Sequence, residues 1–340
     1  MPTNPVQTTR VTPQLRIAVT PVCNLHCFFC RPEGEGIPGN ASEVMGRAEI
    51  AFLVSVAAEV GFTNVKFTGG EPLLRKDMID VVSDTAQCAG VTDVQMVTNG
   101  TLLEQHASDL RNAGLSSLTI SLDAATPETF QVVRGGDLVP VLRGLEAARA
   151  AGLEVRINAV ISRRNVHEIP GLIAVARSHG TSLKLLDLVN LTAPEGNGAW
   201  LEEFVPFTEV RRLLEDIGAS YEGLEPTPGG VGAPLLRFRT LDGVQVVIKD
   251  SLFGLYFSPS CQSCTKYPCQ DAIISLRVTH DGCLKKCLSR DDNLVPVLGF
   301  LVSRDHESAR SAFQDLFADM AASEFTEGVW QPPTAGRSGQ

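Results

Sequence analysis

The sequence predicts an α/β fold built on a parallel sheet. Six short runs of β-branched and apolar residues recur between Leu15 and Leu188, at a spacing of about 25 to 35 residues. Amphipathic helical patterns separate these runs, and such an alternation is typical of βα units with parallel strands. The pattern fits either an open doubly wound sheet or a barrel. No G-x-G-x-x-G motif follows the first run, which disfavours a dinucleotide-binding version of the fold.

The expected elements can be assigned in chain order. Strands are predicted at 15–19, 64–67, 94–97, 117–121, 155–160 and 183–188. Helices are predicted at 48–60, 78–89, 102–113, 138–151 and 166–178, with one more beginning near Pro127. After a Pro/Gly-rich stretch at 226–234, strands are expected at 235–240, 244–249 and 273–278, and a helix at 308–322. We therefore predict a flexible N-terminus (1–13), a core domain (14–225), a C-terminal domain (226–325) and a loose tail (326–340).

Composition limits the functions that the chain can have. It has 340 residues, of which 44% are hydrophobic and 20% charged, so a folded protein with a sizeable core is expected. The net charge of −10 disfavours a nucleic-acid partner, which requires a basic surface. No apolar stretch is long enough to span a membrane, and residues 1–12 lack the apolar segment of an export signal. We predict a cytoplasmic protein without a membrane partner.

The nine cysteines are grouped along the chain, and their number is odd. Without an export signal, this argues against a disulfide scaffold and for metal ligands. Cys23, Cys27 and Cys30 have a C-x3-C-x2-C spacing directly after the first predicted strand. Three thiolates on one loop can bind three irons of a [4Fe–4S] cubane and leave the fourth iron open. Zinc is the alternative, with His26 as a fourth ligand from the same loop.

Further polar motifs follow the later strands, where parallel α/β barrels carry their chemistry. After the second strand comes Gly69-Gly70-Glu71, whose glycines allow close approach of the backbone to a ligand and whose carboxylate could neutralise an ammonium group. The polar residues at or near the ends of the third, fourth and fifth strands are Thr98, Asn99, Ser121, Asp123 and Asn158.

With these motifs, the first 190 residues resemble the radical S-adenosylmethionine (radical SAM) enzymes. The resemblance implies a partial (β/α)6 TIM-like barrel, followed by a small C-terminal α+β domain. In that family the reduced [4Fe–4S] cluster cleaves S-adenosylmethionine (SAM) to methionine and a 5′-deoxyadenosyl radical, which abstracts hydrogen from the substrate. A one-electron donor such as flavodoxin or ferredoxin is the implied partner. The residues implied in SAM binding are Gly69, Gly70, Glu71, Thr98, Asn99, Ser121, Asp123 and Asn158.

A second cysteine group lies near the C-terminus. Cys261, Cys264 and Cys269 precede a predicted hairpin with an Asp-Gly turn at 281–282, and Cys283 and Cys287 follow that turn. The hairpin can bring Cys287 back beside the first three cysteines. A zinc-ribbon site is one interpretation of this pattern. After a radical SAM domain, a second [4Fe–4S] cluster bound by Cys261, Cys264, Cys269 and Cys287 is favoured, with Cys283 as the alternative ligand.

From about Leu15 to Leu288 the chain resembles the GTP 3′,8-cyclase family of molybdenum-cofactor biosynthesis. Matching segments include residues 69–74, the turn at 135–137 and Cys287-Leu288. Where that family has cations that hold a triphosphate, this chain has Val22, Asn64 and Ser275. Each lost charge-assisted contact is worth about 1.5–3 kcal/mol, so GTP is not the expected substrate. A monophosphate, a carboxylate or a sugar acid could still be held by Lys66, Arg75, Arg156, Lys184 and Arg277.

The resemblance therefore implies a radical SAM enzyme acting on a small nucleotide, nucleoside or sugar-derived substrate. The expected outcome is carbon–carbon bond formation, cyclisation or rearrangement in a specialised biosynthetic pathway. Three alternatives stay open: a peptide-modifying radical SAM enzyme, a GTP 3′,8-cyclase proper, and a non-catalytic iron–sulfur or zinc scaffold. Peptide-modifying relatives usually carry a leader-peptide recognition domain, and the short segment before the first predicted strand leaves no room for one.

Overall fold

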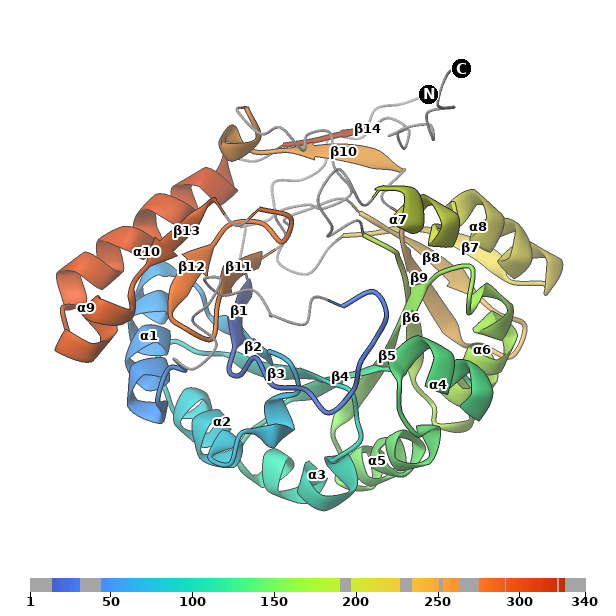
Figure 1. Cartoon of the computed structure of the whole chain (residues 1–340), viewed down its shortest axis with the longest axis horizontal. Helices are drawn as coiled ribbons and strands as arrows, with labels where there is room; N and C mark the ends of the chain where they lie inside the picture. Colours follow the sequence, from blue (N-terminus) through green and yellow to red (C-terminus); the bar gives the residue numbers. More distant parts are fainter. Residues whose placement is uncertain are drawn as a thin grey trace.

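A computed structural model describes residues 14–30, 44–189, 197–226, 234–250, 253–262, 275–290, 292–322 and 324–327. Its main feature is a curved 12-stranded sheet with helices on the convex side, which forms an open barrel (Figure 1). The predicted loose segments at 1–13 and 328–340 lie outside the described residues, as do Cys264 and Cys269. The predicted α/β class and partial barrel are confirmed.

Six parallel strands form the centre of the sheet, and each is followed by helical structure. The strands, which pair in chain order, are β1 (Gln14–Ala18), β2 (Asn64–Thr68), β3 (Asp93–Thr98), β4 (Ser117–Ser121), β5 (Glu154–Ile161) and β6 (Ser182–Asp187). The helices are α1 (Arg47–Val60), α2 (Met78–Ala86), α3 (Leu103–Asn112), α4 (Pro127–Arg134), α5 (Leu138–Ala150) and α6 (Ile169–Ser178), with short 3₁₀ turns at Pro72–Leu74 and Val166–Glu168. All six predicted strands and all predicted helices of this half are confirmed, with ends that differ by a few residues.

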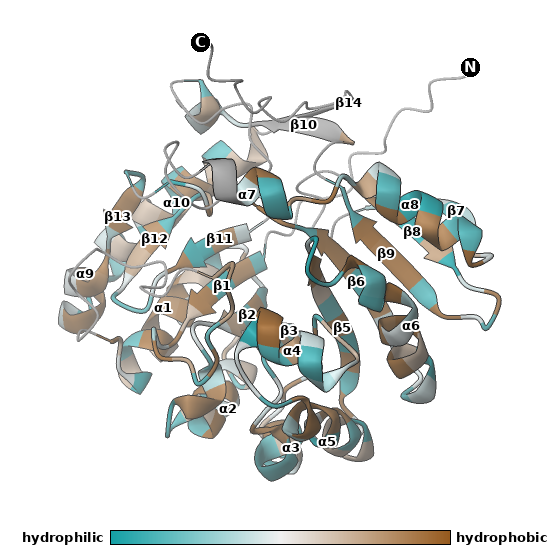
Figure 2. Cartoon of the chain, turned by 45° about the vertical axis from the view of Figure 1, so that its right-hand side comes forward, coloured by the Kyte–Doolittle hydropathy of each residue, from teal (hydrophilic) through white to brown (hydrophobic). Residues whose placement is uncertain are grey.

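Alternation along the strands separates a core face from an inner face. In β5, Val155, Ile157, Ala159 and Ile161 are buried in the core beneath the helices, and the residues between them point to the concave side. The strands are largely apolar, whereas helices such as α3 and α8 combine polar and apolar segments (Figure 2). The core is therefore one layer between the sheet and its helices.

The C-terminal half completes the same sheet. At one end β9 (Gln245–Lys249) pairs parallel with β6 and is followed by β8 (Leu235–Arg239) and β7 (Ser220–Glu225). At the other end β11 (Ser275–Val278) pairs parallel with β1 and is followed by β12 (Cys283–Lys285) and β13 (Leu294–Pro296). The sheet thus continues through the boundary predicted near residue 226. Gly282, with φ 76°, forms the predicted turn between β11 and β12.

The sequence patterns did not predict several of the remaining elements. These are α7 (Asn197–Glu203), α8 (Phe207–Asp216), α9 (Leu298–Ser303), a 3₁₀ turn at Pro259–Cys261 and a two-stranded sheet of β10 (Gly254–Phe257) and β14 (Glu324–Glu327). The predicted final helix is α10 (His306–Ala321). β14 extends into the segment predicted as a loose tail. No helix in the described residues is long and apolar enough to cross a membrane.

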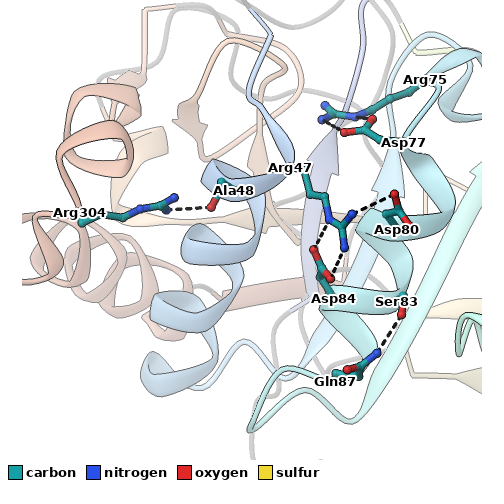
Figure 3. A network of polar contacts seen from close by, with 9 residues as sticks. All are labelled: Arg47, Ala48, Arg75, Asp77, Asp80, Ser83, Asp84, Gln87 and Arg304. Carbon is teal, nitrogen blue, oxygen red and sulfur yellow. Dashed lines mark hydrogen bonds and ion pairs between the residues drawn. The ribbon is translucent and has the colours of Figure 1, made fainter.

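The first helices of the barrel contact one another and the C-terminal helices α9 and α10 on the outside of the barrel. Arg47, at the start of α1, forms ion pairs with Asp80 and Asp84 of α2, and Arg304 donates a 2.8 Å hydrogen bond to the carbonyl of Ala48 (Figure 3). Helix α10 packs on α1, where its aromatic rings contact Phe62. These contacts join α9 and α10 to the first helices of the barrel.

Candidate active site

The cysteine loop (residues 19–30) follows β1 and lies at the carboxyl end of the strands, over the concave side of the sheet (Figure 1). The backbone of the next strand connection is hydrogen-bonded to it. Gly70 N donates to the carbonyl of Thr20 at 2.7 Å, and Glu71 N donates to the carbonyl of Val22 at 2.8 Å. Residues 69–71 are therefore held directly against the segment that carries Cys23.

This close approach requires both glycines of the 69–71 motif. A Cβ atom at position 70 would lie 2.1 Å from the carbonyl oxygen of Val22, and one at position 69 would lie 2.5 Å from that of Thr20. Gly69 also has φ +150°, which side-chain-bearing residues rarely adopt. The glycines serve the packing of two loops against each other, in addition to any approach to a ligand.

Glu71 is fully buried, and its carboxylate joins the ends of β2 and β3. It accepts hydrogen bonds from the backbone of Leu73 at 3.1 Å, the hydroxyl of Thr98 at 2.7 Å and the backbone of Asn99 at 2.7 Å. Burial raises the pKa of Glu71, and these hydrogen bonds oppose that shift. The carboxylate thus has chain donors on both oxygens and ties the 69–71 turn to the end of β3.

Asn99 connects the end of β3 with the first cysteine. Its side-chain amide donates to Asn24 at 2.8 Å and to the Cys23 sulfur at 3.8 Å, and its oxygen accepts from the backbone of Thr101. The backbone N–H of Leu25 is a second donor to the Cys23 sulfur, at 3.4 Å. The sulfur of Cys23 therefore lies among donors that would stabilise a thiolate.

Cys27 has a charged donor. The guanidinium of Arg134, at the end of α4, donates to the Cys27 sulfur at 3.4 Å and forms a 2.5 Å ion pair with Asp123. Both members of the pair are buried, and Asp123 also accepts a 2.7 Å hydrogen bond from the backbone of Val160. Burial raises the pKa of the Cys27 thiol, and Arg134 opposes this shift. Sequence reasoning did not identify Arg134, because its contact with the cysteine depends on the path of α4.

These surroundings fit an iron–sulfur cluster. Two of the three thiols accept hydrogen bonds, and the third, Cys30, is exposed on the same loop. Within the described ranges, no three His, Cys, Asp or Glu side chains are arranged around a single ion. A cubane does not require three side chains around a single ion, because each thiolate binds a different iron atom. Cys23, Cys27 and Cys30 are thus suited to the predicted cluster.

The remaining predicted SAM contacts lie on neighbouring strands. Ser121 of β4 and Asn158 of β5 are partners in register, and both are partly exposed. Asp123 lies just beyond β4, but its carboxylate is engaged by Arg134 and Val160. The structure therefore brings Ser121 and Asn158 together at the inner face and places Asp123 beneath the cysteine loop.

A row of cations crosses the inner face of the sheet. Lys285, Arg277, Arg16 and Lys66 occupy paired positions on β12, β11, β1 and β2. Because paired residues on adjacent strands point to the same face, four cationic side chains lie side by side. We call these four residues the cation row. Sequence reasoning identified Lys66 and Arg277 but missed Arg16 and Lys285, although they alternate with core residues in the same way.

Lys184 on β6 faces the same interior. The pKa of Lys184 is lowered to about 7, first by burial and then by Lys249, Arg16 and Arg156, while Glu225 opposes the shift. Burial likewise lowers the pKa of Lys66 well below its ordinary value, with contributions from Arg16, Lys184 and Arg156 and opposition from Asp93. These like charges therefore repel one another across the barrel, and an anion bound among them would relieve the repulsion.

The other two predicted substrate cations have carboxylate partners. Arg75 pairs with Asp77 at 2.7 Å and donates to the carbonyls of Val19 and Met45 (Figure 3 shows the ion pair). Arg156 is exposed and pairs with Glu154 at 2.9 Å. Arg75 thus supports the base of the cysteine loop, and Arg156 contributes to the field at Lys66 and Lys184 from the edge of the interior.

Part of the second cysteine group is described. Lys286, next to Cys287, donates to the hydroxyl of Ser260 at 3.1 Å and pairs with Asp319 at 3.0 Å, and Arg290 donates to the carbonyl of Ser260 at 3.0 Å. Since Ser260 precedes Cys261, these contacts join the segments of Cys261 and Cys287. The Cys283 side chain is buried, and burial together with the nearby Asp281 raises its pKa to about 11.

Sequence comparisons give the relatives of this chain. Residues 17–175 match the model of the Radical SAM superfamily. The chain is 32% identical over 292 residues to a probable GTP 3′,8-cyclase of Methanococcus aeolicus, covering 84% of this chain and 88% of that protein. It is 32% identical over 288 residues to a GTP 3′,8-cyclase of Limosilactobacillus fermentum, covering 82% of this chain and 80% of that protein.

Solved structures share the fold. The structure of native anSMEcpe with bound AdoMet superposes with a TM-score of 0.56 at 17% identity, over 86% of this chain and 82% of that one. Streptococcus suis SuiB bound to the precursor peptide SuiA gives a TM-score of 0.52 at 17% identity, over 61% of this chain and 46% of that one. At such identities the likeness concerns the fold alone.

Proposed function

This chain belongs to the radical SAM superfamily and is a relative of the GTP 3′,8-cyclases, and from this premise we propose that it acts on a small anionic nucleotide, nucleoside or sugar derivative. The carrying observation is the cation row, together with Lys184. Binding of an anion would offset the repulsion that lowers the pKa of Lys66 and Lys184, so the interior favours a phosphorylated or carboxylated substrate. The outcome we propose is carbon–carbon bond formation, cyclisation or rearrangement.

The residues at the carboxyl end of the strands have distinct parts in this proposal. Cys23, Cys27 and Cys30 hold a [4Fe–4S] cluster, which when bound supplies the electron that cleaves SAM to a 5′-deoxyadenosyl radical. The backbone of residues 69–71 accepts the SAM ammonium group, and Ser121 and Asn158 bind its polar groups. Glu71, Thr98 and Asn99 hold these loops in place through the hydrogen bonds described above.

The departures from the cyclases favour a substrate with less charge than GTP. Val22 is 59% exposed beside the first cysteine, and Asn64 and Ser275 lie at the amino-terminal ends of β2 and β11. Asn64 is hydrogen-bonded to Gln14 and Asp93, within a neutral and acidic network. A triphosphate would find fewer cations there, so a monophosphate or carboxylate fits the remaining ones better.

Turnover by anaerobically reconstituted protein tests the proposal. With SAM and dithionite, we expect 5′-deoxyadenosine, and deuterium transfer into it from a deuterated sugar phosphate, sugar acid or nucleoside monophosphate. Cys27→Ser should abolish 5′-deoxyadenosine formation, and Cys88→Ser should leave it unchanged. Equal deuterium transfer from GTP would support a cyclase instead, and transfer only from uncharged nucleosides would contradict the role of the cations.

We also propose a second [4Fe–4S] cluster held by Cys261, Cys264, Cys269 and Cys287. The contacts of Lys286 and Arg290 with Ser260 support it, because they join the segments of the first and last of these ligands. Iron analysis should give about eight irons per chain, and about four in Cys261→Ser. About four irons with one zinc in the unmodified protein would favour a zinc site instead.

A further inference from the structure

Arg134 and Asp123 form an ion pair beside the cysteine loop that is not needed to hold the backbone of this loop in place. The loop is already held by the backbone of α4: His26 N donates to the carbonyl of Arg134 at 3.0 Å, and Phe28 N donates to that of Val133 at 3.2 Å. Any residue at position 134 would offer the same carbonyl. The side chain therefore has a role beyond this backbone contact.

Burying this pair is costly, which makes its placement informative. The Arg134 side chain is 9% exposed and that of Asp123 is 0% exposed. Two charges taken out of water lose hydration that their attraction only partly restores, and apolar residues of similar volume are often at least as stable. Although burial opposes its charge, Asp123 and Cys27 raise the pKa of Arg134, so the guanidinium stays cationic beside the sulfur. The ring of Phe29, 5.6 Å from the guanidinium carbon, covers it further.

The three cysteines therefore have different environments. Cys23 accepts hydrogen bonds from a backbone N–H and a neutral amide, and Cys30 is exposed. Cys27 accepts from a fixed and buried cation. Reduction of a cluster places additional negative charge on the cluster and its sulfur ligands. A cation at this distance stabilises the reduced form more than the oxidised form, and little water lies nearby to screen it.

We propose that Arg134, oriented by Asp123, is a positioning residue that raises the reduction potential of the cluster bound by Cys23, Cys27 and Cys30. The inference rests on the proposed cluster. Arg134 makes the cluster easier to reduce by an external one-electron donor, and Asp123 limits the effect by partly neutralising the cation. The two charges thus act in opposite directions on one potential.

A redox titration followed by the EPR signal of the reduced cluster tests this directly. Because SAM changes the EPR signal of the cluster that binds it, addition of SAM identifies the signal of the cluster bound by Cys23, Cys27 and Cys30. Arg134→Gln should lower the midpoint potential, since it removes the cation. Asp123→Asn should raise it, since it leaves the cation without its counter-charge. The midpoint potential of Arg134→Lys should lie between those of Arg134→Gln and the unmodified protein. The midpoint potential of the double variant Arg134→Gln/Asp123→Asn should be higher than that of Arg134→Gln alone. Arg143→Gln, at an exposed cation of α5, is the matched control and should leave the potential unchanged.

Opposite shifts in the two single variants support the inference, because a purely structural role has no reason to change sign with charge. Equal potentials in all variants, or shifts of the same sign in both, would overturn it. If Arg134→Gln does not fold, the pair Arg134→Lys and Asp123→Asn still distinguishes the outcomes. Failure of the proposed function would be visible separately, as unmodified protein without a SAM-responsive EPR signal.

Discussion

The cysteine loop and the cation row differ in the charges that they bring together in one barrel. Around the loop, donors and acceptors find partners in the chain: both oxygens of Glu71 accept hydrogen bonds, and Asp123 faces Arg134. In the row, Arg16 has Lys66 on one side and Arg277 on the other. In the first region, hydrogen bonds and an ion pair within the chain hold the loop in place. The second region brings several positive charges close together.

The difference suggests separate tasks for the two regions. A support with satisfied hydrogen bonds gains stability from each of its members and holds ligands in a fixed geometry. A row of like charges loses stability in the free protein and recovers it when an anion binds. Substitutions in the two regions should therefore change stability in opposite directions.

The largest effect is expected where the cysteine loop meets the 69–71 turn. Gly70→Ala places a methyl group 2.1 Å from the backbone oxygen of Val22, so the two loops must move apart. We expect a loss of about 3 kcal/mol in the free energy of unfolding, together with loss of iron. Urea denaturation and iron analysis measure both. Gly299→Ala, in α9, has nothing within 4 Å of the added atom and should be neutral. Equal stability of the two variants would show that the loops can separate, and the region would then not be a rigid support.

A smaller loss is expected at the buried carboxylate of the same region. Glu71→Gln keeps the shape but turns an NH₂ group toward a donor, either Thr98 or the backbone of Asn99, and leaves one of them unsatisfied. We expect a loss of about 2 kcal/mol in the free energy of unfolding. Thermal or urea unfolding checks this, with the exposed Glu128→Gln of α4 as the control. A stability equal to that of the control would mean that the carboxylate is dispensable for the support.

Sequence reasoning predicted more of the cysteine loop than of the cation row. The cysteine spacing and the 69–71 motif are local, so the metal ligands and the contact between two loops could be anticipated from a few neighbouring residues. The resemblance to the cyclases also indicated Lys66, Lys184 and Arg277 as cations that could hold an anionic substrate. Arg16 was not among them, because its place between Lys66 and Arg277 follows only from the strand pairing.

Other features could not be read from the sequence. Two of the partners of Glu71, Thr98 and Asn99, come from the end of the next strand. Arg134 reaches Cys27 from the end of a helix more than a hundred residues away in the chain. Such contacts depend on three-dimensional packing of several elements. Likewise, composition predicted a boundary near residue 226, but strand pairing carries the sheet through it. Arg75 has a local signal, since Asp77 lies two residues along, that could have indicated its structural ion pair.

For the cation side, pH provides a test at Lys184. Its pKa is lowered to about 7 in the folded protein, so from about pH 7 up to its ordinary value near 10.5 the unfolded chain binds a proton that the folded chain has lost. The free energy of unfolding should therefore rise with pH across this window, by about 1.5 kcal/mol after allowance for partial solvation. Lys184→Met should remove that part of the pH dependence, which urea denaturation at pH 6 to 9 measures, and Lys76→Met, at an exposed lysine, should not. If the unmodified protein instead became less stable relative to Lys184→Met as the pH rises, the lowered pKa of Lys184 would be contradicted.

The smallest effect decides the comparison, because its sign is opposite to those at Gly70 and Glu71. Lys66→Met removes one charge from the repulsion with Arg16 and Lys184 and keeps a half-buried apolar stem. We expect the free protein to become more stable by about 1 kcal/mol, and its affinity for inorganic pyrophosphate to fall about tenfold. Urea denaturation without added anion and calorimetric titration with pyrophosphate measure the two quantities on the same sample. Loss of both stability and affinity would mean that Lys66 is a satisfied structural residue, and the row would then be a support like the cysteine loop. A gain in stability with a loss in affinity would show that the chain sacrifices stability at this position for the binding of an anion.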